Sequence, residues 1–269
     1  MLRILKRASA LTGVALLPSA ALAGAWTMPE GKGQVVVTAT VSQAKTSFDA
    51  SGDRQPTPRY DKQELQMLLE YGITDRVTAI LAPGLQRVEI ASPVNAHRSG
   101  LGFTEFGGRF RLMQGETPDF SWVLSAQTTM RVPGTYDTAN PAAIGYTGME
   151  VDVRGLLGAS FTVGGWPAFV DLQLGQRFRT GGPPSEWRAD FTAGMRVAPQ
   201  WGLLAQSFNV ISEGDGSPPF TSTNYHKLQM SVIYYLTEQW ALQGGLFTTV
   251  AGRNALQENG LVVGTGYKF

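Results

Sequence analysis

The sequence predicts an all-β protein, a twelve-stranded antiparallel up-and-down transmembrane β-barrel, and three observations support this prediction. Segments of about eleven to thirteen residues alternate apolar and polar positions with a period of two, which is the spacing of a strand and not of a helix. Only 16% of the residues are charged, against about 25% in an ordinary soluble domain, so much of the surface is expected to avoid water. The links between the segments alternate between short and mostly longer ones.

The N-terminal residues have the composition of a secretory signal peptide. Basic residues precede an apolar stretch, and Ala21–Ala23 supplies the small residues typical of a cleavage site. A transmembrane helix is the alternative, but the stretch contains Pro18 and is shorter than the roughly 20 residues that a spanning helix needs. The sequence therefore predicts a signal peptide over 1–23 and a single outer-membrane β-barrel domain over 24–269, located in the bacterial cell outer membrane after export by the cleaved signal peptide.

Each of the twelve expected strands is bounded by turn-forming residues. The strands lie at about 34–46, 60–71, 76–88, 101–113, 120–132, 148–160, 167–179, 186–197, 202–212, 225–236, 240–250 and 260–269. Strands of about nine to eleven residues cross the outer membrane, and single-chain bacterial barrels have an even number of them.

The links between these strands predict how the barrel is oriented. Mostly longer, polar links are expected at 47–59, 89–100, 133–147, 180–185, 213–224 and 251–259. They alternate with short turns. This alternation is typical of an up-and-down barrel with short periplasmic turns and longer outer loops.

Apolar and charged residues occupy opposite faces of the strands. In the segment AFVDLQLGQRFR (168–179), Leu172 and Leu174 share one face, whereas Asp171 and Arg177 share the other. A soluble lipocalin-like barrel has the same alternation with the apolar face inside. The alternation alone therefore leaves both kinds of barrel open.

Two further features favour the membrane barrel, with the charged face toward the lumen. Trp166, Trp201 and Trp240 lie at short turns, where a membrane barrel has an aromatic girdle. The last strand places apolar residues on one face up to a terminal Phe269, which resembles the signal read by the outer-membrane assembly machinery. We therefore expect Leu172 and Leu174 to face lipid.

The charges of the opposite face are the candidate functional residues. A twelve-stranded barrel is expected to leave a narrow polar passage, since about eight strands give a filled interior and about sixteen a wide channel. Two interpretations stay open: a structural network, because buried charges must be paired, or a basic-leaning constriction that selects anionic or polyhydroxylated solutes. The residues concerned are Glu105, Arg109, Arg111, Asp152, Arg154, Asp171, Arg177, Arg179, Arg188, Asp190 and Arg196.

Catalytic, cofactor and metal sites are not predicted. His97 falls in an outer loop and His226 at the start of a strand on its lipid-facing side, where only Ser222 or Asn224 could complete the group that a phospholipase needs. The acidic residues of the outer loops follow no protease motif. The run Glu213–Ser217 is a weak candidate for Ca²⁺, with a solvated loop as the alternative.

Two parts of the sequence resemble known families. The stretch GAWTMPEGKGQ, which starts the mature chain, resembles outer-membrane proteins that include the XagA-like proteins of biofilm polysaccharide operons. The stretches YGITDRVTAI and YYLTEQWAL resemble the periplasmic turns of barrels in the phenol-degradation transporter family. Both resemblances imply passive passage or export of small molecules or polysaccharide, and neither assigns a role to a particular residue.

The function expected from the sequence is a channel-type outer-membrane barrel for passive passage of small polar or anionic solutes. The alternatives are a structural or export component of a biofilm polysaccharide system, with a closed lumen, and a lipid-modifying outer-membrane enzyme. The expected partners are outer-membrane lipid and lipopolysaccharide, the barrel assembly machinery, and small polar solutes or polysaccharide. Nucleic acid is not expected, because the formal net charge of +1 falls to 1 − 3 = −2 when the predicted signal peptide with its three basic residues is removed.

Overall fold

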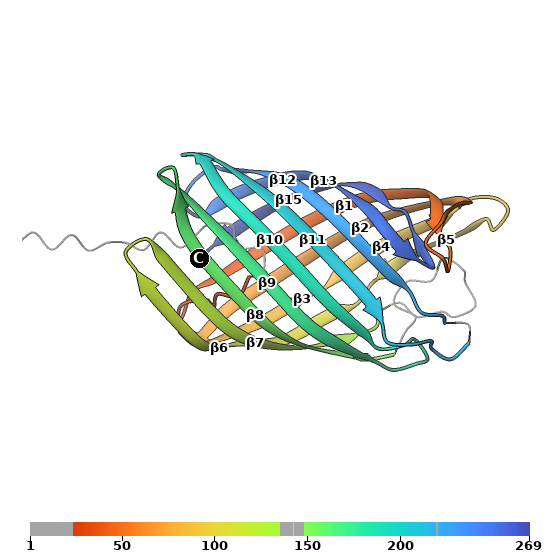
Figure 1. Ribbon diagram of the computed structural model, residues 1–269, viewed down its shortest axis with the longest axis horizontal. Coiled ribbons are helices and arrows are strands. Elements are labelled where there is room, and N and C mark those ends of the chain that lie inside the picture. Colours follow the sequence, from red (N-terminus) through yellow and green to blue (C-terminus); the bar gives the residue numbers. More distant parts are fainter. Residues whose placement is uncertain (1–23, 135–141, 143–147, 219) are drawn as a thin grey trace, which may run out of the picture.

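The computed structural model describes residues 24–134, 142, 148–218 and 220–269, and the predicted signal peptide lies outside these residues. Nowhere in these ranges is there a helix long and apolar enough to cross a membrane. The strands form one continuous antiparallel sheet that curls into a barrel (Figure 1). They are β1 (Gly33–Phe48), β2 (Arg54–Thr74), β3 (Val77–Ala82), β4 (Gly84–Ile90), β5 (Ala96–Leu101), β6 (Thr104–Thr117), β7 (Phe120–Val132), β8 (Glu150–Val163), β9 (Trp166–Arg179), β10 (Glu186–Ala198), β11 (Trp201–Ser212), β12 (Asn224–Tyr235), β13 (Trp240–Arg253), β14 (Ala255–Leu256) and β15 (Asn259–Lys268).

The barrel closes because β1 pairs with β2 on one side and with β15 on the other. Two pairs of consecutive strands, β3 with β4 and β5 with β6, each make up one interrupted barrel strand, and so do β14 and β15. The predicted fold class, a closed barrel of twelve antiparallel strands, is confirmed. Short turns and Phe269 lie at one end, here called the turn end, and the opposite end is the loop end (Figure 1).

Two of the predicted outer loops are mostly strand. The link predicted at 47–59 is reduced to 49–53, where the Asp49 carboxylate accepts hydrogen bonds from the backbone N–H groups of Ser51 (2.8 Å) and Asp53 (2.9 Å). The link predicted at 89–100 is reduced to 91–95. Prolines within 54–59 suggested a loop, but this part of β2 pairs only with the end of β1 and tolerates missing N–H donors.

The interruption between β3 and β4 has a simple cause. Pro83 has no N–H group, so it cannot donate to a neighbouring strand. Its carbonyl still accepts a hydrogen bond from the N–H of Met67 on β2 (3.1 Å), which holds the two short strands in line. A break therefore replaces the single strand predicted over 76–88.

The faces of the sheet follow the predicted alternation. Leu172 and Leu174 are exposed on the outside of the barrel, by 39% and 55%, whereas Asp171 and Arg177 are buried inside it. At the turn end, the rings of Trp201 and Tyr234 are 4.7 Å apart and belong to an exposed aromatic belt. The outside is thus apolar with an aromatic rim, and the inside is where polar chemistry is concentrated.

Candidate functional site

The charged residues predicted from the sequence all lie on strands, at positions that face the lumen. Strand pairing places Asp152 opposite Arg177 and Arg188 next to Gly175, so charges from neighbouring strands meet across the sheet. The predicted residues are Glu105, Arg109 and Arg111 on β6, Asp152 and Arg154 on β8, Asp171, Arg177 and Arg179 on β9, and Arg188, Asp190 and Arg196 on β10.

In the loop half of the lumen, these residues join others in a network that we call the charge ladder. Arg177 is its most buried guanidinium, and its Nη2 lies 2.9 Å from Asp152 Oδ2 while its Nη1 lies 3.4 Å from Glu186 Oε1. Each charge is thereby paired, as burial requires. The members are Glu105, Arg131, Glu150, Asp152, Arg154, Arg177, Arg179, Glu186, Arg188 and Asp190.

The charge ladder reaches beyond a single pair of strands. Arg179 Nε of β9 lies 3.0 Å from Glu150 Oε1 of the adjacent β8, and Arg154 Nη1 of β8 lies 2.8 Å from Asp190 Oδ2 of β10. The ladder therefore crosslinks the lumen faces of β6 to β10. The sequence-predicted set does not include Glu150 and Glu186. Each is the first residue of its strand, at the loop end, where no preceding strand residue indicates which face its side chain takes.

A buried ion pair lies in the lumen outside the charge ladder. Arg109 and Glu70 are almost completely buried, and Arg109 Nη2 lies 2.7 Å from Glu70 Oε1. Arg109 also donates to the side-chain oxygen of Gln127 (3.0 Å) and to the backbone carbonyl of Trp26 (2.8 Å). This arginine therefore connects the barrel wall to a segment that precedes the first strand.

That segment, Gly24–Met28, lies inside the barrel and is called the inner segment. The N–H of Ala25 donates to Asp171 Oδ2 (2.6 Å), and the carbonyl of Ala25 accepts from the Ser125 hydroxyl (2.6 Å). The N–H of Met28 donates to the Thr78 hydroxyl (2.8 Å). A backbone without its own secondary structure is thus satisfied by lumen side chains.

The Trp26 ring fills an apolar region at the turn end of the lumen. It packs edge-on against Phe169, with ring centroids 6.1 Å apart. It also contacts two buried apolar clusters, which contain Phe169, Leu204, Ile233 and Tyr235 in one and Ala25, Val123 and Leu156 in the other. The sequence predicts a narrow polar passage, and this apolar region departs from that prediction. Alternation indicates which face a residue takes and not what fills the space beyond it.

The lumen face of β11 to β13 carries amides and hydroxyls instead of a charge ladder. The Gln229 amide donates to the side-chain oxygen of Gln206 (3.0 Å), and the Gln243 amide donates to the Ser231 hydroxyl (3.0 Å). These groups can exchange hydrogen bonds with an uncharged solute. The lumen therefore has an ionic wall and, around these glutamines, a polar wall without a charge ladder, on which Lys227 of β12 is paired with Glu258.

Beside the ionic wall, and not lined by β11 to β13, is a cavity of about 370 Å³. Arg109, Gln127, Arg154 and Gln173 contribute polar groups to it from β6 to β9, and the opposite side comes from β1 and β2. Gln173 also donates to Asp171 (2.8 Å), so this part of the cavity wall adjoins the anchor of the inner segment.

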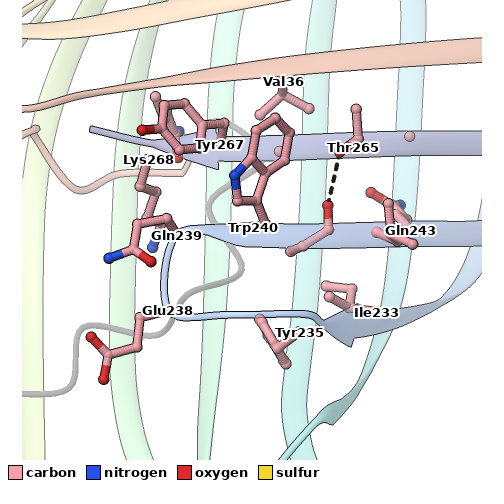
Figure 2. Close-up of a pocket in the computed structure, with 15 residues that line it drawn as sticks. Val36, Ile233, Tyr235, Glu238, Gln239, Trp240, Gln243, Thr265, Tyr267 and Lys268 are labelled. Atoms are coloured by element: carbon pink, nitrogen blue, oxygen red, sulfur yellow. Dashed lines mark hydrogen bonds between the residues drawn. The ribbon is translucent and has the colours of Figure 1, made fainter.

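A smaller cavity of about 50 Å³ lies at the turn end, between β13 and β15 (Figure 2). Lys268 and Gln239 lie at one side of it, and the hydroxyl of Thr265 donates to the carbonyl of Ala241 (3.3 Å). Tyr235, which also lines it, stacks under the guanidinium of Arg196 at 4.1 Å. Within the described residues, Arg111, Arg196 and Lys268 form no salt bridge, so these cations do not belong to the charge ladder.

The residues weighed as catalytic or metal-binding have other partners. The His226 ring is 2.8 Å from Asn209 Oδ1, and the side-chain oxygen of Asn224 accepts a hydrogen bond from the N–H of Ser212 (3.0 Å). Asp215 accepts a hydrogen bond from the N–H of Ser222 (2.9 Å). Across the described ranges, no three or more His, Cys, Asp or Glu side chains are grouped to hold a metal ion.

Comparison with known proteins places the chain in a family. The family described as the MetA-pathway of phenol degradation matches residues 21–264. The chain belongs to this family. The resemblance of the turn stretches to phenol-degradation transporters is therefore confirmed, while the similarity to XagA-like proteins stays a prediction. No curated protein matches the sequence.

Solved structures match the fold. An outer membrane channel from Pseudomonas putida F1 is 16% identical, with a TM-score of 0.72 over 91% of this chain and 98% of that one. The transport unit of the autotransporter AIDA-I from Escherichia coli is 8% identical, with a TM-score of 0.50 over 89% and 91% of the two chains. At these identities the similarity shows that the architecture is that of outer-membrane barrels.

Proposed function

We propose that the protein is an outer-membrane channel through which small polar solutes, anions above all, pass by diffusion. The observation that carries this proposal is the polar cavity of about 370 Å³ enclosed by the barrel wall. A closed sheet with an apolar outside and a polar inside is the arrangement by which outer-membrane barrels provide a route for water-soluble molecules.

The pairing of the lumen charges supports a preference for small polar solutes. Within the charge ladder each guanidinium faces at least one carboxylate, so the ladder has little net field to exclude either sign of ion. The amides of Gln206 and Gln229 offer donors and acceptors on the other wall. A hydrated solute can replace water hydrogen bonds along such a surface.

The three cations outside the ladder support the preference for anions. Arg111 belongs to the turn-side part of β6, and Arg196 and Lys268 lie near the turn end of β10 and β15. No carboxylate neutralises them among the described residues. Unpaired cations along a pore raise the local concentration of anions.

The outer surface supports the proposed location and partners. Exposed apolar side chains such as Leu174 and Leu246 suit outer-membrane lipid, and the aromatic belt suits the interface with its headgroups, including those of lipopolysaccharide. The exposed Phe269 at the end of the last strand is the feature that we propose for recognition by the assembly machinery. Export by a signal peptide over 1–23 completes this proposal.

We also propose that the protein has no catalytic role. A serine nucleophile needs a base at its hydroxyl. Here the His226 ring bonds to Asn209 Oδ1, and among the described residues it makes no hydrogen bond to Ser222 or to another serine. Replacing His226 with Ala should therefore leave outer-membrane lipid composition unchanged.

Planar-bilayer recording of the purified, refolded barrel tests the channel. We expect discrete conductance steps and a reversal potential in a salt gradient that indicates anion preference. The alternative, a structural or export component with a closed lumen, is favoured by the inner segment that occupies part of the lumen. Absence of current at any voltage, together with no solute entry in liposome swelling, would overturn the channel proposal.

A further inference from the structure

We propose that the inner segment is the constriction of the channel and that the Trp26 ring sets its size limit. This inference rests on the proposed function and names the residue that determines specificity by size. It depends on three observations: how the segment is anchored, how far its tryptophan reaches, and where it stands relative to the lumen cavity.

The anchors hold the inner segment to one side of the barrel. Asp171 on β9, Ser125 on β7 and Arg109 on β6 each bind a backbone atom of Ala25 or Trp26 at 2.6–2.8 Å. Asp171 and Ser125 are buried along with Ala25. A hydrogen bond to a charged partner in a buried site is strong, so the segment is fixed at several points and does not hang free.

The Trp26 ring extends from these anchors toward the other side. Its neighbours include Gly158 on β8, where an added Cβ would stand only 2.7 Å from the ring. They also include the cluster formed by Phe169, Leu204, Ile233 and Tyr235, which brings in β11 and β12. The segment and its ring together therefore reach from β6 to β12 across the lumen.

The position of the segment puts it in the path of a solute. Arg109 lines the lumen cavity and also binds the Trp26 carbonyl. Gln173 lines the same cavity and binds Asp171, which holds Ala25. A solute that leaves this cavity toward the turn end must pass the inner segment. Predicted cleavage after Ala23 would add an ammonium group at Gly24, close to Asp171, and so tighten the anchor.

Cysteine chemistry in bilayers tests the position of Trp26 directly, because the chain contains no cysteine. Trp26→Cys is recorded before and after a negatively charged methanethiosulfonate reagent is added to the side of the turn end. We expect the current to fall by about half or more, because the added group occupies the narrowest part of the pore. The matched control is Trp201→Cys, whose side chain belongs to the exposed aromatic belt of the outer face and whose modification should leave the current unchanged.

A truncation tests the size limit. Trp26→Ala should raise single-channel conductance about twofold or more and admit larger sugars in liposome swelling, since it removes the ring that fills the lumen. Trp201→Ala, on the outer aromatic belt, should change neither. Folding of each variant is checked by its heat-dependent mobility in gels. If Trp26→Ala does not fold, Trp26→Phe takes its place; this variant keeps a ring, so its conductance and size limit should be close to those of the wild type.

The possible outcomes separate this inference from the proposed function. If the wild type conducts but the reagent leaves the current of Trp26→Cys unchanged, or lowers that of Trp201→Cys equally, the constriction is overturned and the channel stands. A silent wild type with a conducting Trp26→Ala variant would show that the ring closes the lumen instead of setting a size limit, which overturns the channel and this inference. Absence of current in both, with correctly folded barrels, overturns the channel and the constriction together.

Discussion

The loop half of the lumen and its turn half are stabilised in different ways. In the loop half, salt bridges such as that between Arg177 and Asp152 (2.9 Å) link neighbouring strands through their own side chains. In the turn half, the strands present apolar side chains, among them Leu156 and Ile233, and the inner segment packs between them. One half is crosslinked within the wall, and the other is filled by a separate piece of chain.

This difference has a functional consequence. A paired charge cannot move without leaving its partner uncompensated. The side chains of the loop half are therefore expected to be rigid and to keep one arrangement. The inner segment is held mainly by hydrogen bonds and by one large ring. Changes there should alter what passes the channel more than whether the barrel folds. The following predictions test this division of roles, starting from the largest effect.

Removing the central arginine of the charge ladder should have the largest effect on stability. Arg177→Met leaves Asp152 and Glu186 buried with one partner fewer, which should lower the free energy of unfolding by about 3–5 kcal/mol. The measurement is the urea midpoint of the barrel in lipid vesicles, followed by gel mobility.

The matched control is Arg87→Met on the outer face of β4. Arg87 is also paired with a carboxylate, Glu89, but its side chain is 59% exposed. An exposed pair contributes only about 0–1 kcal/mol, so this variant should unfold close to the wild-type midpoint. Equal losses in the two variants would show that burial in the ladder is not what makes Arg177 important.

A single added methyl group should disturb the turn half. Gly158→Ala places a Cβ 2.7 Å from the Trp26 ring, so the ring or the strand must shift, at a cost of about 1–3 kcal/mol. Because the displaced ring no longer fills the lumen in the same way, single-channel conductance should also change. The urea midpoint and the conductance are measured on the same preparation.

Gly155→Ala is the control on the same strand. An added Cβ at Gly155 meets no atom within 4 Å, and this position faces outward. Its stability and conductance should therefore stay at the wild-type values. If Gly155→Ala changed the conductance as much as Gly158→Ala did, the contact with Trp26 would not be the cause.

The barrel wall is the part of the structure that the sequence predicts well. Alternation is a local property, so the faces of Leu174 and Arg177 follow from their places in one short segment. Strand ends are less certain, since the same polar residues occur in loops and in strands that extend beyond the membrane. The 47–59 link was predicted too long for this reason, because β2 already begins at Arg54.

The inner segment could not be predicted from local pattern. Its contacts join residues far apart in the chain, such as Ala25 with Asp171 and Ala25 with Ser125. No periodicity marks a segment whose backbone is satisfied by distant side chains. The sequence does place a glycine, Gly158, and a carboxylate, Asp171, on the lumen face, where they leave room for the Trp26 ring and accept the Ala25 N–H. Neither residue type indicates which part of the chain it contacts.

The smallest predicted effect concerns the cations outside the charge ladder. Arg196→Gln combined with Lys268→Gln should lower the anion-to-cation permeability ratio by about twofold, because pore-lining charge selects ions. Stability should hardly change, since neither residue forms a salt bridge within the described part of the chain. The control, Arg76→Gln with Lys32→Gln, removes the same charge from exposed positions at the turn end, where solvent screens it. A ratio that falls equally in both double variants would assign the selectivity to the net charge of the turn end and not to the two lumen cations.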